Sequence, residues 1–133
     1  MIDIENEIFD TIADKLRKTF VDISVYGEEV QIPSSFPCAT IVEADNAVVE
    51  KTQDSSNMEN HASLMYEVNV YSNKTHGKKT ECKKIFAVID TMLLDFGFTR
   101  INANPQTMEN STIYRMVGRY SAVVSKDLKI YRR

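Results

Sequence analysis

Residues 62–98, ASLMYEVNVYSNKTHGKKTECKKIFAVIDTMLLDFGF, contain the pattern around which the rest of the chain is organised. From Leu64 to Tyr71 apolar and other residues alternate, which is typical of a strand with one buried face. After a basic turn, apolar residues recur at three- and four-residue steps from Cys82 to Phe96, as in an amphipathic helix. Gly97 follows, and glycine readily adopts the left-handed conformation that ends a helix. The stretch therefore predicts a strand, a turn and a helix.

The N-terminal segment predicts a second helix, over residues 4–19. Ile8, Ile12 and Leu16 fall at four-residue steps and form an apolar stripe. Asp3 has the side chain of a helix N-cap. Acidic residues gather in the first turns and basic residues in the last turn, as the helix dipole favours.

Between these helices the sequence predicts four strands, counting the one within residues 62–98. A short strand over 23–26 is followed by a loop that contains Pro33 and Pro37. Residues 38–43 and 47–52 predict two strands that pair through a turn at Asp45-Asn46. Residues 53–61 are polar and without a period, so we expect an exposed loop there.

The C-terminal third predicts two more strands. Residues 99–103 form a short strand, and residues around Pro105 form a second polar loop. Residues 112–124 form the longest strand, with Tyr114, Met116, Tyr120, Ala122 and Val124 on one face and Arg115, Arg119 and Ser121 on the other.

Gly118, in the middle of that strand, indicates either a bulge or a close approach by a neighbouring group. The basic tail adds a possible edge strand over residues 128–130. The element order α-β-β-β-β-α-β-β predicts an α+β fold, with two helices packed on one face of a mainly antiparallel sheet. Length, and the lack of a linker, predict a single domain over residues 1–133.

Composition narrows the functional classes. The net charge of −3 indicates no overall attraction to nucleic acid or to a membrane surface. No apolar run approaches the roughly 20 residues that a spanning helix needs, so we expect no membrane association. Cys38 and Cys82 fall at apolar positions, which favours free core cysteines over a disulfide and a reducing cytoplasm as the compartment.

The chemical motifs that the sequence offers are weak. His61 and His76 lack further ligands at metal-binding spacing. The turn over residues 72–80 superficially resembles a phosphate-binding loop, but Ser72 stands where the motif needs its first glycine and Lys79 where it needs Ser or Thr. No nucleophile motif is present. We therefore expect no catalytic residues, no metal and no cofactor.

A nucleic-acid-binding module is the main alternative from another class. Residues 114–120 combine basic and aromatic side chains, but Gly118 precedes Arg119, whereas the ribonucleoprotein signature has the basic residue before the glycine. That reading requires the sheet tyrosines and the basic tail to be exposed together.

A resemblance adds a specific function. Residues 37–100, PCATIVEADNAVVEKTQDSSNMENHASLMYEVNVYSNKTHGKKTECKKIFAVIDTMLLDFGFTR, and residues 101–124, INANPQTMENSTIYRMVGRYSAVV, are similar to the tail terminator, or tail completion (head–tail joining), proteins of long-tailed bacteriophages and prophages. The resemblance implies an α+β subunit of the virion tail or neck, assembled in the host bacterial cytoplasm. It implies that subunits close into a ring, typically a hexamer, which caps the tail tube, stops its polymerisation and offers a joining surface to the head–tail connector protein.

The partners implied are therefore other copies of the chain, the tail tube protein and the connector, with DNA passing through the ring as the sole nucleic-acid contact. The family has no catalytic or metal residue to transfer to this chain. The alternative functions are another head–tail connector or stopper protein, or a small nucleic-acid-binding α+β module.

Four segments are candidates for the assembly interface. Acidic residues of the first helix and basic residues of the tail can form a head-to-tail contact between neighbours, and polar loops are candidates for contact with tube or connector, the second being residues 103–111. The candidate residues are Glu5, Glu7 and Asp10 in the helix, Asp54, Met58, Glu59, Asn60 and His61 in the first loop, and Lys126, Lys129, Arg132 and Arg133 in the tail.

Overall fold

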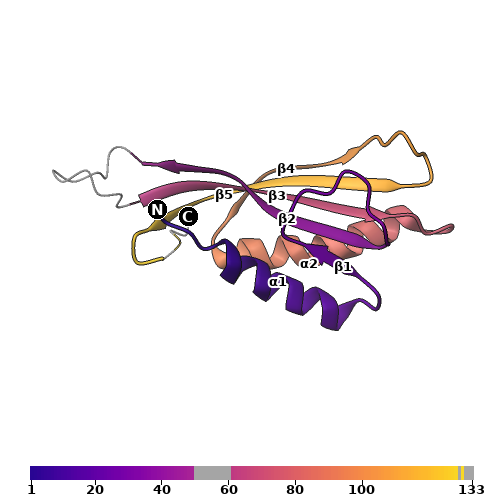
Figure 1. Ribbon diagram of the computed structural model, residues 1–133, viewed down its shortest axis with the longest axis horizontal. Coiled ribbons are helices and arrows are strands. Elements are labelled where there is room, and N and C mark those ends of the chain that lie inside the picture. Colours follow the sequence, from indigo (N-terminus) through magenta and orange to yellow (C-terminus); the bar gives the residue numbers. More distant parts are fainter. Residues whose placement is uncertain (50–60, 129, 131–133) are drawn as a thin grey trace.

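The computed structural model describes residues 1–49, 61–128 and 130. Figure 1 shows five strands in one twisted layer, with both helices lying across the same face of it. This arrangement confirms the predicted α+β class. The elements in chain order are α1 (Glu5–Thr19), β1 (Ser24–Tyr26), β2 (Cys38–Val48), β3 (His61–Ser72), α2 (Lys78–Phe96), β4 (Thr99–Gln106) and β5 (Tyr114–Ser125).

The sheet has the strand order β1-β2-β3-β5-β4. β1 pairs with β2 in parallel, and every other neighbouring pair is antiparallel. β3 therefore lies at the centre, and β1 and β4 lie at the two edges. The central position of β3 agrees with its apolar pattern, because a central strand buries more of its length than an edge strand does.

The core lies between the sheet and the helices. Alternate residues of β3, from Ala62 to Val70, point toward the helices and are buried. Tyr120 of β5 lies on the same side, and its ring centroid is 6.4 Å from that of Phe86 in α2. The apolar stripe of α1 packs into the same core through Ile8, Ile12, Ala13 and Leu16.

The predicted pair of strands over 38–43 and 47–52 is wrong in one respect. Cys38–Val48 is a single strand, and Asp45 and Asn46 stay in the ladder opposite Met65 and Leu64 instead of forming a turn. The chain accommodates Ala44 as the extra residue of a bulge, which bends a strand without ending it. The chain therefore has one strand fewer before α2 than predicted. Residues 50–52, and residues 53–60 of the predicted loop over 53–61, lie outside the described residues; His61 belongs to β3 and not to the loop.

Two further local predictions need correction. Residues 104–106 belong to β4 and not to a loop; Pro105 is tolerated there because β4 is an edge strand. The helix N-cap is Ile4 and not Asp3, although the Asp3 carboxylate still accepts a hydrogen bond of 3.0 Å from the Glu5 amide.

The structure decides between the alternatives for Gly118 and confirms the role of Gly97. Gly118 is a close approach, since a Cβ built on it would overlap the ring of Phe86, whereas the bulge on this side of the sheet lies in β4 between Arg100 and Asn102. Gly97 ends α2 in the left-handed conformation, as predicted, with φ +108°. In the tail, Ile130 forms a single bridge to Val124, and Lys129 lies outside the described residues.

Both cysteines are buried and free, as the sequence predicts. Burial raises the pKa of the Cys38 thiol to about 11. Burial, with a smaller effect from the charge of Glu81, raises the pKa of the Cys82 thiol to about 12. Among the described helices, none has the length and apolar character needed to cross a membrane.

Candidate functional site

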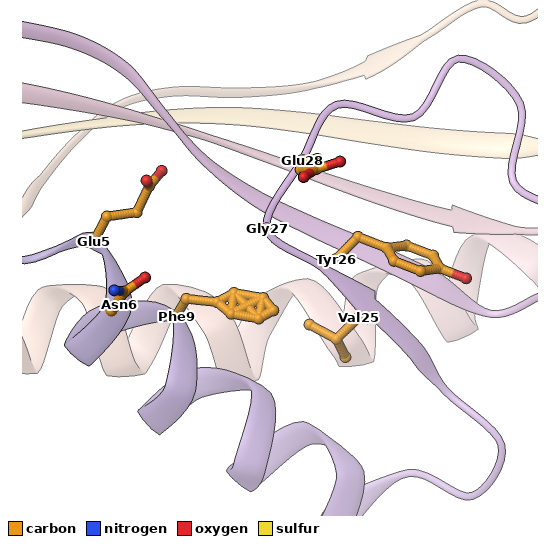
Figure 2. A pocket seen from close by; sticks show the side chains of 7 residues that line it. All are labelled: Glu5, Asn6, Phe9, Val25, Tyr26, Gly27 and Glu28. Atoms are coloured by element: carbon orange, nitrogen blue, oxygen red, sulfur yellow. The ribbon is translucent and has the colours of Figure 1, made fainter.

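An open pocket of about 580 Å³ lies beside the first two turns of α1. Figure 2 shows that α1 forms one wall, and that β1 with the residues directly after it forms the other. Its volume falls within the range of small-molecule and side-chain binding pockets. The residues that line it are Glu5, Asn6, Phe9, Val25, Tyr26, Gly27 and Glu28.

The floor of the pocket is apolar and tightly packed. Val25 is buried in the main core, and the Phe9 ring packs against that core from α1. The chain passes directly over this ring at Gly27, where a Cβ would lie 3.2 Å from Phe9 Cδ1. Glycine therefore allows the backbone to lie against the ring and keeps the floor shallow.

The rim of the pocket is acidic and aromatic. The Glu28 side chain is exposed, and within the described residues its carboxylate has no hydrogen bond or ion pair. Tyr26 is 38% exposed at the same rim. The Glu5 carboxylate accepts a hydrogen bond of 2.8 Å from the Glu43 amide, which fixes its position against β2. None of the seven lining residues is basic, and two of them, Glu5 and Glu28, are acidic. The nearest basic group that the described residues bond to this lining is the Arg17 guanidinium, which donates to the Val25 carbonyl at 3.5 Å.

Further carboxylates extend this acidic rim to the bulge of β2. Burial raises the pKa of Glu43, and the charges of Glu5, Asp3 and Asp45 raise it further, while a hydrogen bond from Asn46 lowers it. The Asn46 amide also donates to the Ile2 carbonyl at 2.8 Å and so holds the N-terminal residues against this bulge. The region therefore combines fixed carboxylates with a permanent excess of negative charge.

A second pocket, of about 390 Å³, lies at the start of α2 and is basic. The exposed side chains of Lys74 and Lys84 line it, together with Phe20 from the end of α1. Its one carboxylate, Glu81, accepts a hydrogen bond of 2.6 Å from the Ser72 hydroxyl. Gly77 precedes the helix with φ +87°. The other residues lining this pocket are Gly77 and Thr80.

The predicted interface residues that the structure describes fall into two places. Glu5 lines the acidic pocket, while Glu7 and Asp10 are exposed on the same helix. His61 opens β3 half-buried, opposite Ser125, which places it next to exposed Lys126. The remaining predicted residues, Asp54, Met58, Glu59, Asn60, Lys129, Arg132 and Arg133, lie outside the described residues.

Sequence reasoning missed most of the acidic pocket. Phe9, Tyr26 and Glu28 are not among the residues that the sequence predicts for the interface. The available signal was the run Gly27-Glu28-Glu29 directly after a strand, but nothing in the sequence indicates that this run lies against the first turns of α1.

The positions of the tyrosines bear on the nucleic-acid alternative. Tyr66, Tyr71 and Tyr120 are each at most 1% exposed, and Tyr114 is partly buried against the core. Stacking platforms for bases need exposed aromatic rings on the sheet. These four tyrosines therefore do not supply such a platform.

The described residues contain no group of three or more His, Cys, Asp or Glu side chains arranged to hold a metal ion. The acidic pocket is instead suited to a cation of organic type. A guanidinium or ammonium group pairs with carboxylates and also packs favourably over aromatic rings.

Comparison with protein-family models and with curated proteins gave no match for this chain.

Proposed function

We propose that this chain is a virion structural protein resembling a phage tail terminator. In this role, several copies form a ring on the end of the tail tube, stop its polymerisation and present the joining surface for the head–tail connector. The subunit acts through its surfaces and carries out no chemical reaction.

The observation that supports the proposal is the agreement between the fold and the resemblance. The resemblance implies an α+β subunit, and the chain folds as two helices on one face of a five-stranded, mostly antiparallel sheet. A subunit of a closed ring also needs two different complementary surfaces. The acidic pocket and the basic pocket are two such surfaces with opposite charge.

The experiment that tests the proposal is a mass measurement by light scattering during size exclusion. The purified protein is measured alone and after mixing with polymerised tail tube protein of the phage or prophage that encodes it. We expect a ring-sized species, alone or bound to tube ends, and tubes that no longer lengthen when more tube protein is added. A protein that stays monomeric and leaves tube growth unchanged contradicts the proposal.

A parallel binding assay separates the terminator from a connector or stopper protein. Immobilised connector and immobilised tube ends are each offered to the same protein preparation. A terminator binds tube ends in the absence of connector, whereas a stopper binds the connector in the absence of tubes.

A further inference from the structure

The charged side chains of this molecule are separated along its length. Figure 1 shows α1 running away from the N-terminal end of the molecule. Phe20, directly after α1, lines the same pocket as residues at the start of α2. The end of the molecule where α1 ends and α2 begins, which we call the basic end, carries the exposed side chains of Lys15, Lys18, Lys74, Lys79, Lys83 and Lys84. The acidic pocket lies nearer the other end of α1, which is 15 residues or about 22 Å long.

At the basic end, two of the nearby carboxylates are already engaged. Asp14 forms an ion pair of 3.0 Å with Lys18, and Glu81 accepts from Ser72. Within the described part of the chain, the ammonium groups of Lys74 and Lys84 have no ion pair. The basic end therefore presents a surplus of positive charge around the hollow that Phe20 lines.

At the acidic pocket, carboxylates and not ammonium groups are without ion pairs. Glu28 is exposed without an ion pair among the described residues, and Asp10 is likewise exposed and unpaired. Asp10 lies one turn after Asn6, and because residues four apart share a helix face, it extends the rim of the pocket. Phe9 and Tyr26 add aromatic surface over which a cation packs.

We infer that the basic end of one copy of this chain docks on the acidic pocket of a second copy. Lysine side chains from the turn before α2 and from its first turns, Lys74 and Lys84 foremost, enter the pocket between Glu28, Tyr26 and Phe9. The contact joins two different surfaces, so each copy keeps one surface of each kind available for a further neighbour. Closure of such a chain of contacts into a ring rests on the proposed function, whereas the pairwise contact does not.

A second copy is the partner that the charges favour. Both surfaces occur on the same molecule, so each copy offers one positive and one negative surface to its neighbours. Complementary potentials both accelerate docking and fix its orientation. Nucleic acid would compensate the basic end alone and would leave the acidic pocket unused.

The test uses charge reversal on each surface separately. One variant carries Asp10→Lys and Glu28→Lys; the other carries Lys74→Glu and Lys84→Glu. All four side chains are exposed and have no bond to the rest of the described chain, so both variants are expected to fold. Self-association is measured by sedimentation equilibrium up to about 1 mM protein, at about 0.05 M and about 0.5 M salt.

Two matched controls reverse charges outside the contact. Asp127→Lys reverses an exposed carboxylate in the turn after β5, which lines neither pocket and is not among the candidate interface residues. Arg119→Glu reverses an exposed basic side chain of β5, which lines neither pocket and is not among the candidate interface residues.

We expect the wild-type protein to associate, and to do so less at high salt. Each double variant alone should associate at least about tenfold more weakly. An equimolar mixture of the two variants should regain association, because the reversed pocket of one then meets the reversed basic end of the other. Both controls should behave as the wild type.

Several results would overturn the inference: a wild-type protein that stays monomeric throughout, double variants that associate normally, or a mixture that fails to recover. Tight binding of a duplex DNA oligonucleotide by the wild type, lost in the Lys74→Glu/Lys84→Glu variant while self-association persists, would assign the basic end to nucleic acid instead. The tube-growth assay separates this result from the proposed function. If both double variants cap tubes normally, the proposed contact is refuted and the terminator role stands. If self-association depends on these charges but the protein does not cap tubes, the contact stands and the terminator role is refuted.

Discussion

The two faces of the central sheet are made from neighbouring residues of the same strands, yet they have different roles. Arg119 of β5 is 52% exposed in its side chain and lies 3.4 Å from the Glu67 carboxylate on the open face. The next residue, Tyr120, is fully buried on the helix-covered face and donates a 2.6 Å hydrogen bond to Asp90 of α2.

The difference separates stability from surface function. An exposed ion pair such as Arg119–Glu67 contributes about 0–1 kcal/mol, whereas burial of one large apolar side chain contributes about 1.5–3 kcal/mol. The helix-covered face therefore accounts for most of the stability. Charged residues at the ends of the molecule and on the open face can therefore be substituted without loss of the fold. The charge-reversal variants thus report on association and not on folding.

One part of the open face is buried and so also contributes to stability. Cys38, Tyr71 and Ile113 form a small second cluster there, against which Phe36 packs. The Tyr71 hydroxyl donates to the Val30 carbonyl at 3.0 Å, so the segment between β1 and β2 covers this end of the face.

The largest expected contrast comes from truncating one side chain on each face. Ile89→Ala removes a fully buried side chain of α2 and is expected to lower the free energy of unfolding by about 2–5 kcal/mol. Arg119→Ala on the open face should lower it by less than about 1 kcal/mol. Urea denaturation of both variants measures the contrast, and equal losses would contradict the assignment of stability to the helix-covered face.

Gly118→Ala tests how tightly the helix-covered face is packed. Because the new Cβ would overlap the ring of Phe86, which is 4% exposed in the core, we expect a loss of about 1–3 kcal/mol. The double variant Gly118→Ala/Phe86→Leu has room for the methyl group and should lose less than the two single changes combined. If the double variant loses as much stability as the two single variants together in the same denaturation experiment, the contact between residue 118 and Phe86 does not limit the packing.

Two fully buried tyrosines on the helix-covered face differ in whether the hydroxyl is bonded. Tyr120→Phe removes the bond to Asp90, which also holds Arg100 at 3.0 Å, and should cost about 1.5–3 kcal/mol. Tyr66→Phe removes a buried hydroxyl that has no hydrogen-bond partner in the described structure, and should be neutral or stabilising. Thermal unfolding of the pair provides the measurement, and a larger loss for Tyr66→Phe would refute the assignment of these bonds.

The smallest expected effect is the pH dependence of stability that Glu43 of β2 causes. The pKa of Glu43 is raised from its ordinary value of 4.5, chiefly by burial, so the native state binds this proton more tightly than the unfolded state does. Ionisation of Glu43 therefore opposes folding, and its effect grows as pH rises above 4.5 through the raised pKa.

Glu43→Gln removes that ionisation. Relative to the wild type, the variant should be about equally stable near pH 4.5 and slightly more stable, by less than about 1 kcal/mol, at pH 7. Unfolding free energies measured across this pH range are the test. A variant that is less stable than the wild type at pH 7 would show that the Glu43 carboxylate is not under electrostatic strain.

Prediction from sequence succeeded where local pattern and burial agree. Both helices, the central strand and the faces of β5 follow directly from apolar periodicity, since the period differs between helix and strand. It failed at Asp45-Asn46, where a turn-forming pair remains inside a strand. Pairing along the full length of β3 provides ladder partners on both sides of the bulge, and this tertiary gain outweighs the local turn preference.

The candidate site was predicted less completely than the fold. Acidic residues of α1 were identified, and Glu5 does line the pocket. The sequence predicts the basic partner surface in the tail, whereas the described structure has a concentrated set of exposed lysines where α1 ends and α2 begins. These lysines are distributed over residues 15–84, and only the packing of the two helices brings them to one end.

The sequence by itself determined the α+β class, the two amphipathic helices, the buried faces of the main strands and the free state of both cysteines. These depend on interactions between residues close in the chain and on the burial of apolar side chains, which periodicity reveals. The tertiary structure alone decided the strand order, the bulge in β2, the contact between Gly118 and Phe86, and the pocket between Phe9 and Glu28. Those features depend on which distant segments meet, and that choice is made by the packing of the whole core and not by any one stretch of the chain.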